Sequence, residues 1–170
     1  ARRDAAALAA RTLRRAQEAL DGEGLSHVHI CPETMGKIQQ LGDLDEVLFF
    51  CGAEERFLPC IDFGHLNART LGGLSGKADF AAVLDAVRDR LGEERGRCFH
   101  AHFSRIEFSK GGEKRHLTFA EPLGFGPEPG PLMELVAERA LTPVVICESA
   151  GTQAEDAAAM RDLWRAARGA

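Results

Sequence analysis

The sequence predicts an α/β protein, a parallel β/α barrel of the TIM type that is represented by its C-terminal four strand-helix units in one domain, residues 1–170. Three observations favour this class. β-rich runs alternate with helical patterns, which is typical of parallel sheets with right-handed crossovers. Each predicted strand ends in a side chain that can bind a metal, and barrels place functional residues at strand ends. A complete barrel takes ~250 residues, so 170 residues correspond to part of one.

Helical periodicity defines the segments between the strands. The first helix, 2–20, is amphipathic, and its expected inner face consists of Ala5, Leu8, Ala9, Ala16 and Leu20. Further helices are expected at 42–52, at 78–92 and at 131–143. A capping-box pattern at Thr152 and Glu155 begins the last helix. Its expected inner stripe consists of Met160, Leu163, Trp164 and Ala167.

Four β-rich runs are predicted as strands, at 25–33, 56–65, 97–104 and 144–149, and the polar segment that follows the third is predicted as a loop. An open doubly wound sheet is the competing architecture. Its ligands gather at one switch point, whereas nearly every strand of a barrel can contribute a functional residue. The strand ends therefore favour the barrel. Four strands would leave two unpaired edges, so we expect self-association of the exposed half-barrel.

The composition excludes several classes of protein. A formal charge of −5 argues against a protein that coats nucleic acid through bulk charge, although a local basic pocket remains possible. No long apolar run and no leader pattern is visible, so we expect a cytoplasmic location and no membrane partner. Cys31, Cys60, Cys98 and Cys147 lie in apolar runs without CxxC spacing, which predicts reduced, buried core thiols.

The strand ends carry the candidate chemistry. Glu33, Asp62, His102 and Glu148 each end a predicted strand. The carboxyl ends of parallel strands meet at one edge of a sheet, so we expect these side chains to converge. Carboxylate and imidazole ligands suit Zn²⁺ or Mn²⁺. One such residue alone is more commonly a helix cap, but four together indicate a metal site.

Two further histidines and a set of basic residues extend this prediction. His65 follows Asp62 by three residues, and His116 follows the polar segment after the third strand. His116 taken alone would be a surface residue. Basic side chains beside metal ligands are what an anionic phosphate substrate requires. The candidates for phosphate contacts are Lys37, Arg69, Arg105, Lys110, Lys114 and Arg115, which would otherwise form a solvated rim.

Five motifs resemble, in order and spacing, the C-terminal half of the endonuclease IV-type AP endonuclease family, which belongs to the xylose isomerase-like TIM barrels. They are "PET" at 32–34, "CIDFGHLNA" at 60–68, "HFSRI" at 102–106, "KRH" at 114–116 and "ICES" at 146–149. The resemblance implies up to three zinc ions, with Glu33 as a bridging ligand and with His65 and His116 on the third ion. Lys114 stands where the family has Asp, so the third zinc either recruits the adjacent Glu113 or is lost.

The resemblance implies a zinc-dependent hydrolase that cleaves DNA at abasic sites through an activated water, with Glu33 and Glu148 as catalytic residues. Two alternatives remain open. A sugar isomerase or epimerase of the same superfamily would use the quartet around one Mn²⁺ or Mg²⁺, with Glu33 and Glu148 exchanging a proton with the substrate. A non-catalytic half-barrel would keep only a degenerate metal site. His116 discriminates between the first two, because the nuclease needs it and the epimerase does not.

Overall fold

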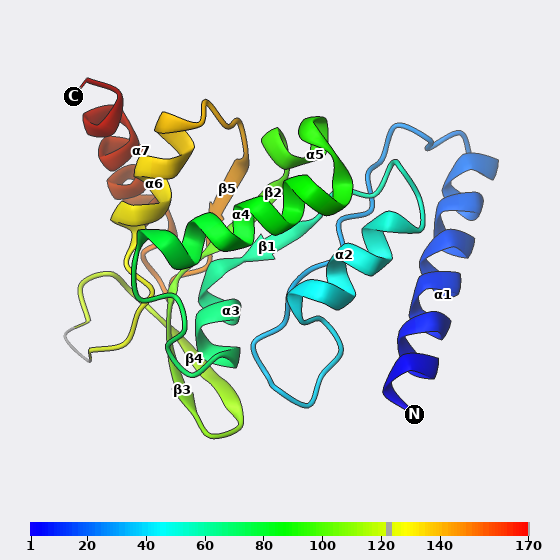
Figure 1. Cartoon of the computed structure of the whole chain (residues 1–170), viewed down its shortest axis with the longest axis horizontal. Helices are drawn as coiled ribbons and strands as arrows, with labels where there is room; N and C mark the ends of the chain where they lie inside the picture. Colours follow the sequence, from blue (N-terminus) through cyan, green and yellow to red (C-terminus); the bar gives the residue numbers. More distant parts are fainter. Residues whose placement is uncertain (122–123, 170) are drawn as a thin grey trace.

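The computed structural model describes residues 1–121 and 124–169. Figure 1 shows the elements in chain order, with the two termini at opposite ends of the molecule. The helices are α1 (Arg2–Gly22), α2 (Leu44–Gly52), α3 (Phe63–Arg69), α4 (Lys77–Leu91), α5 (Glu93–Arg97), α6 (Pro129–Glu138) and α7 (Gln153–Gly169). The strands are β1 (Cys60–Asp62), β2 (His100–Phe103), β3 (Arg105–Ser109), β4 (Gly112–Leu117) and β5 (Val144–Cys147).

A parallel sheet in the order β1-β2-β5 forms the centre of the fold. The register aligns Asp62 with His102, and His102 with Ile146. A single parallel bridge between Glu33 and Cys60 extends the sheet beyond β1. The structure therefore confirms the α/β class and the parallel direction of the strands, and it places the carboxyl ends of the strands at one edge.

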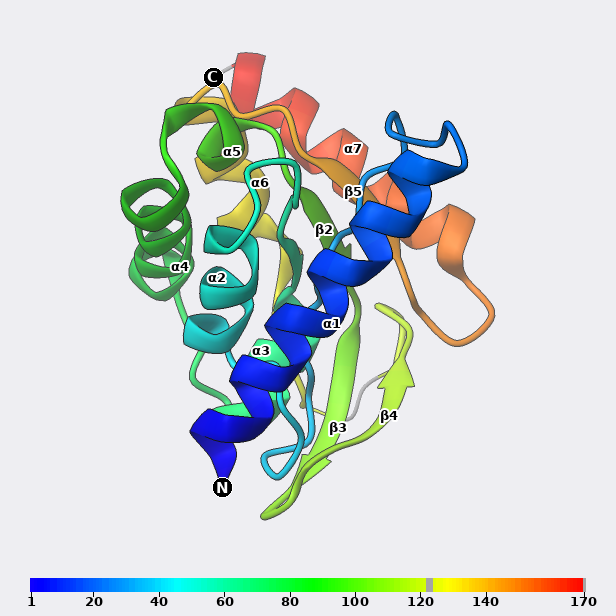
Figure 2. The same cartoon turned by 90° about the vertical axis from the view of Figure 1, so that its right-hand side faces the viewer.

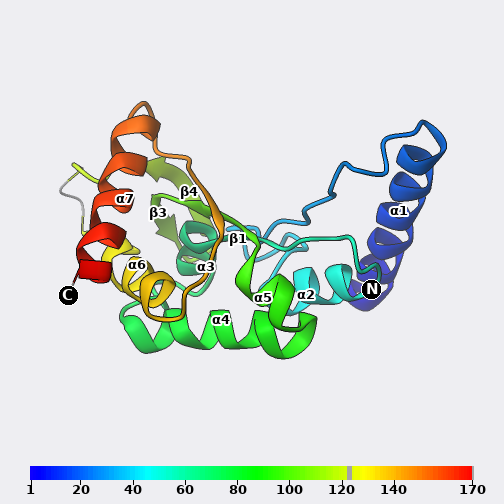
Figure 3. The same cartoon turned by 90° about the horizontal axis from the view of Figure 1, so that it is seen from above.

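Helices cover one face of this sheet. Figure 3 shows α7, α6, α4 and α2 as an arc around the strands, with α1 at its far end. Ile61, Ala101 and Phe103 lie on the covered face and belong to the main hydrophobic cluster. Because side chains alternate along a strand, their neighbours Asp62, His100 and His102 point to the opposite face. That face carries the site described below.

The strand β5 presents exposed apolar side chains. Val144 is 52% exposed and Ile146 is 46% exposed, whereas Cys147 is buried among the helices. Val144 and Ile146 have the parity of Glu148, so they lie on the face away from the helices. An edge strand with exposed apolar residues is a typical place for strand pairing.

The predicted strand at 25–33 is not formed. This run is irregular, with Leu58 N–H donating to Ile30 O, Cys60 N–H donating to Pro32 O, and only Glu33 in a bridge. Pro32 has no N–H to donate, and the run has a partner strand on one side only. The run therefore lies alongside β1 without forming a regular edge strand.

The inner faces of the terminal helices also differ from the prediction. In α1 the buried residues are Ala6, Ala10 and Gln17, while Leu8 is 57% exposed and Ala5 and Ala16 face solvent. The apolar stripe of α1 is wider than the surface that α1 packs against. The part of the stripe next to the predicted face, with Ala6 and Ala10, packs against Phe50 and Leu41. In α7, Met160 is buried as expected, but Leu163 is 39% exposed.

The polar segment predicted as a loop is a β-hairpin. β3 and β4 pair antiparallel around Lys110 and Gly111, with a register shift after Glu107. Gly112 has φ +91°, a conformation that glycine adopts without strain. Figure 2 shows this hairpin beside the loop that precedes α2. The hairpin gives His116 a fixed position that a loop would not provide.

Two other predictions are tested by the fold. The cysteines in the described residues are thiols, as expected, but Cys98 is exposed and Cys31 only half-buried. Cys98 ends α5 before β2 begins, so neither element covers it. In the described ranges, each helix is too short or too polar to cross a membrane.

Candidate metal centre

Asp62 is the most deeply buried carboxylate of the site. Its side chain caps α3, because the backbone N–H of His65 donates to Oδ1 at 2.7 Å. The Thr34 hydroxyl holds the strand end, since Asp62 N–H donates to Thr34 Oγ1 at 2.9 Å. Oδ2 is buried and lies 3.3 Å from His65 Nδ1, but it has no hydrogen-bond partner among the described residues. Burial raises the pKa of the Asp62 carboxyl to about 6, against the lowering effect of His65.

His65 is oriented by the backbone of the neighbouring strand end. Its Nδ1 donates to the Thr34 carbonyl oxygen at 2.8 Å, because a carbonyl can only accept. This bond fixes the tautomer and leaves Nε2 as the ligand nitrogen. Nε2 lies 3.6 Å from Glu113 Oε2. His65 is 7% exposed at its side chain, so its orientation is set by the fold.

His102 lies between the two glutamates. Its Nδ1 is 3.1 Å from Glu33 Oε1 and 3.3 Å from Glu148 Oε1. Contacts with the Cys60 thiol and the Glu33 carboxylate raise the pKa of His102 to about 11. Burial alone would raise the pKa of Glu33, but His102 and the other histidines bring it below its usual value. The His102 imidazolium thus supplies positive charge to a cluster of carboxylates.

The hairpin brings His116 and Glu113 to the same place. His116 Nδ1 is hydrogen-bonded to Ser104 Oγ at 2.8 Å, and its ring meets the His65 ring edge-on with centroids 5.3 Å apart. His116 Nε2 lies 3.7 Å from Glu113 Oε1. Glu113 is only 17% exposed at its side chain. Glu113, rather than Lys114, therefore faces the two histidines.

The expected convergence of the predicted ligands is observed. Three groups have ligand atoms that all lie within 4.8 Å of one another: Glu33, Asp62, His65 and Glu148; His65, His116 and Glu148; and Glu33, Cys60 and His102. All six predicted metal ligands belong to at least one group. That they bind a metal remains a prediction. The donor set consists of carboxylate, imidazole and thiol groups, which are the ligand types that divalent cations accept.

Two of the three arginines proposed as phosphate contacts make hydrogen bonds within the chain, and their contact with a phosphate stays a prediction. Arg69 donates to the carbonyl oxygens of Met35, Lys37, Ile38 and Gln40 and so fixes this loop. Arg105 donates to Phe119 O and to the Glu128 carboxylate. These bonds use the Nη atoms of the two guanidinium groups, and Nε of Arg105 is buried without a hydrogen-bond partner among the described residues.

The hairpin cations face away from the ligands as well. Lys114 and Arg115 both pair with Glu107 on the neighbouring strand. The register places Glu107 opposite Arg115, while His116 lies opposite Ile106 on the other face of the hairpin. Lys37 and Lys110 are exposed. Lys37 forms a bridge with Gly112, and Gly112 is followed by Glu113 of the site. This pairing brings the backbone of Lys37 next to the site.

Sequence reasoning missed the contributions of Thr34, Ser104 and Cys60. The first two orient ligands through hydrogen bonds that depend on the tertiary fold, and no local pattern indicates them. The position of Cys60 beneath the ligands followed from the sequence, but its proximity to Glu33 and His102 did not. Cys60 lies two residues before Asp62 in a strand, so it had to point to the same face as that ligand.

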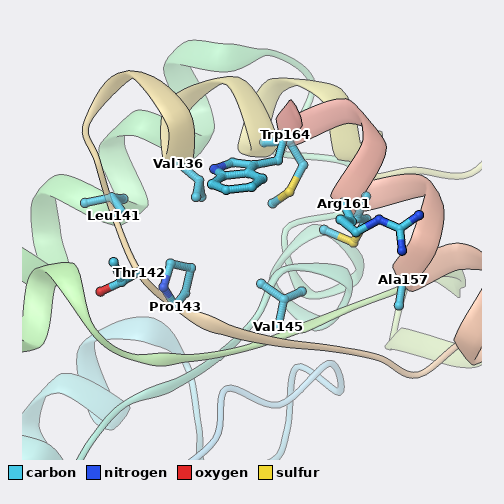
Figure 4. A pocket seen from close by; sticks show the side chains of 10 residues that line it. Val136, Leu141, Thr142, Pro143, Val145, Ala157, Arg161 and Trp164 are labelled. Carbon is cyan, nitrogen blue, oxygen red and sulfur yellow. The ribbon is translucent and has the colours of Figure 1, made fainter. Parts of the chain in front are cut away.

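An apolar cavity lies at the other end of β5. It has a volume of about 340 Å³ and is lined mainly by apolar residues of α6, α7 and the start of β5, including Val136, Leu141, Val145 and Trp164. Figure 4 shows Trp164 and Val136 on its upper side and Pro143 and Val145 below. Glu148 ends β5 at the opposite end of the strand, so this cavity is separate from the candidate metal centre.

Comparison with known proteins shows one informative similarity. The chain is 45% identical over 95 residues to an uncharacterized protein of Methanocaldococcus jannaschii. The match covers 56% of this chain and 34% of the relative, so the chain spans about a third of the length of the curated relative. No family model matches the chain, and no solved structure matches it.

Proposed function

We propose that this chain forms a metal centre for phosphodiester hydrolysis, of the kind that its resemblance to endonuclease IV-type enzymes implies. The observation that carries the proposal is the convergence of the carboxylates of Glu33, Asp62 and Glu148, with ligand atoms within 4.8 Å of one another, where Oδ2 of Asp62 is buried without a hydrogen-bond partner among the described residues and lies 3.3 Å from His65 Nδ1. Such an oxygen costs several kcal/mol in an apolar environment unless a cation or donor compensates it. The acidic group beside two histidines is therefore a site for a divalent cation, with Zn²⁺ first and Mn²⁺ or Mg²⁺ as alternatives.

Two of the three donor groups share no residue with each other: His65, His116 and Glu148 form one set, and Glu33, Cys60 and His102 form the other. The third group, Glu33, Asp62, His65 and Glu148, overlaps both sets. Asp62 lies within reach of Glu33 and Glu148, one from each set. This division supports more than one ion, which favours the hydrolase over a single-metal isomerase. A bound divalent cation would neutralise phosphate oxygens and lower the pKa of a water molecule.

The side chains have distinct tasks in this proposal. Glu33 and Glu148 would be the carboxylate ligands of the two sets, and Glu148, with 35% side-chain exposure, is placed to accept a proton from the attacking water. His65 and His116 keep their ring orientation through Thr34 and Ser104. Water supplies the nucleophile, so no covalent protein intermediate is required. DNA with an abasic site is the substrate to test first, because the resemblance points to it.

Fewer residues are assigned to phosphate contacts in this proposal than the sequence predicted. Arg69 and Arg105 support the loops, and Lys114 and Arg115 pair with Glu107. Lys37 is exposed and next to the hairpin that carries Glu113. The acidic charge of the whole chain then matters little, because a lesion taken out of the helix needs only a small contact surface.

We propose further that the sheet is half of a barrel. The parallel elements follow in the order of the chain, beginning with the bridge at Glu33 and ending with β5, and the helices lie on one face. A second copy would cover Val144 and Ile146 and pair the edges. Size-exclusion chromatography with light scattering should then report a dimer, and Ile146→Lys should shift it to monomer. A monodisperse monomer at high concentration would reject the pairing.

The decisive experiment compares three variants on metal content and on cleavage of a duplex with one abasic site. His116→Ala should reduce cleavage more than tenfold, or about 1.4 kcal/mol of transition-state stabilisation. Glu148→Ala should abolish cleavage. Lys114→Ala is the matched control on the same strand, and it should change cleavage less than twofold, because its amine pairs with Glu107 on the outer face.

The isomerase remains the second candidate, because the arginines expected to bind phosphate are engaged elsewhere. It requires Glu33 and Glu148 on either side of one metal ion. Epimerisation of a ketose that is lost in Glu148→Ala but kept in His116→Ala, with abasic DNA left intact, would decide for the isomerase. If the protein binds no divalent cation, the non-catalytic half-barrel is the alternative that remains.

A further inference from the structure

Cys60 lies within the candidate metal centre, although it is buried like a core residue. Its side chain belongs to β1 and is 3% exposed. The buried thiols of Cys51 and Cys147 are members of the main hydrophobic cluster, whereas Cys60 is not. Its polar neighbours are instead the Glu33 carboxylate and the His102 imidazole, with ligand atoms within 4.8 Å of one another.

The sheet register explains this placement. Glu33 is the bridge partner of Cys60, so the two side chains stand opposite one another on the same face. His102 pairs with Asp62, two residues after Cys60, and therefore lies diagonal to the thiol. The three side chains thus come from three adjacent segments of one parallel sheet. Such a position is set by strand pairing and not by a flexible loop.

The spacing suits a cation with one sulfur ligand. Zn²⁺ binds sulfur at ~2.3 Å and nitrogen or oxygen at ~2.0–2.2 Å, so two of its ligand atoms can be about 4.4 Å apart at most. Side chains that lie within 4.8 Å need only small rotations to reach this spacing. A sulfur, a nitrogen and a carboxylate oxygen are three ligands of a four-coordinate zinc ion, with one position left open.

We propose that Cys60 is a metal ligand, together with Glu33 and His102, and that its thiolate makes this part of the centre selective for Zn²⁺ or Co²⁺ over Mn²⁺ and Mg²⁺. The inference rests on the proposed metal centre and deepens it. Thiolates favour the softer cations, while carboxylates and water suit Mn²⁺ and Mg²⁺. On binding, the sulfur gives its proton to solvent and forms the bond to the cation, so no oxidant or reductant is involved.

Cobalt provides the direct test, because a thiolate bound to Co²⁺ gives an intense charge-transfer band in the near ultraviolet. The wild-type protein, kept reduced, should show this band at saturation with Co²⁺. Cys60→Ser should lose the band, while Cys31→Ser and Cys98→Ser should keep it. Cys31 is the matched control, because it lies two residues before Glu33 as Cys60 lies two before Asp62.

Affinity measurements give a second readout. In Cys60→Ser, the Zn²⁺ affinity should fall at least tenfold, whereas the Mn²⁺ affinity should change less than about twofold, since Mn²⁺ relies on nitrogen and oxygen ligands. X-ray absorption at the zinc edge of the wild-type protein needs no variant. It should show one sulfur at ~2.3 Å, so the proposal can be tested even if Cys60→Ser does not fold.

The outcomes separate this inference from the proposed function. Co²⁺ binding without a charge-transfer band, a band that persists in Cys60→Ser, or a zinc spectrum without sulfur would each refute the role of Cys60 and leave the metal centre standing. Absence of binding for Co²⁺, Zn²⁺ and Mn²⁺ would reject both proposals together.

Discussion

The two ends of the parallel sheet differ in what they enclose. The apolar cavity beside α6 and α7 is lined by side chains such as Val145, Met160 and Trp164. The other end gathers carboxylates and imidazoles, and one of its buried oxygens, Oδ2 of Asp62, has no partner in the described part of the chain. Apolar surface stabilises a fold when it is buried, whereas an uncompensated carboxylate destabilises it. The difference separates an end whose side chains stabilise the fold from an end whose proposed role is metal binding.

The largest expected effect is on stability and arises at the apolar end. Met160 is 2% exposed and lies with its sulfur 3.5 Å from Cys147 Sγ. Met160→Ala should lower the free energy of unfolding by about 2–5 kcal/mol, because it enlarges an existing cavity. Urea unfolding followed by circular dichroism measures this loss. Metal affinity in the folded variant should stay within about twofold of wild type, and a large change would show that the two ends are coupled.

Asp62→Asn should lower metal affinity without lowering stability, which is the reverse of the result expected for Met160→Ala. The amide keeps the cap on α3, because its oxygen can still accept from His65 N–H. The negative charge of the buried oxygen is lost, so metal affinity should fall about 100-fold, or ~2.7 kcal/mol. The metal-depleted protein should be at least as stable as wild type, since no charge is then buried without a partner. Calorimetric titration and thermal unfolding give the two values. Lower stability with unchanged affinity would contradict the assignment.

A smaller effect is expected at the hairpin. Glu113→Gln should lower the affinity for the cation held by His65 and His116 about tenfold, or ~1.4 kcal/mol, because the carboxylate that faces both rings becomes neutral. Glu107→Gln is the matched control on the neighbouring strand, since its carboxylate pairs with Lys114 and Arg115 on the outer face. Equal losses in both variants would indicate a general electrostatic effect instead of a ligand.

The positions of the strand-end residues followed from local pattern, and those of the hairpin did not. Asp62 and Glu148 follow short β-rich runs, and parallel strands bring such ends together. The hairpin at 105–117 was missed although β3 alternates Ile106 and Phe108 with polar residues, because β4 shows no such alternation. Its pairing depends on Gly112 and on contacts with a distant loop, which no local window contains.

The arginines illustrate a second limit. A basic residue after a strand end can bind a phosphate or can bind backbone carbonyls, and the sequence is the same in both cases. Arg69 contacts four carbonyl oxygens of the loop 35–40 because the fold brings this loop within its reach. Likewise, the wide apolar stripe of α1 left two possible inner faces, and packing selected the one with Ala6 and Ala10. Tertiary contacts resolve what periodicity leaves open.

The contact between Gly36 and Gly112 has a consequence for how this protein can change over generations. Lys37 and Gly112 form a bridge, and Glu113 N–H donates to Gly36 O at 3.1 Å. A methyl group at Gly112 would overlap the Gly36 carbonyl oxygen, and one at Gly36 would overlap Glu113. The sequences of the two segments therefore constrain each other, and a change in one requires a matching change in the other. An insertion in either one moves Glu113 away from His65 unless the other changes with it, so recombination between relatives must exchange both loops together.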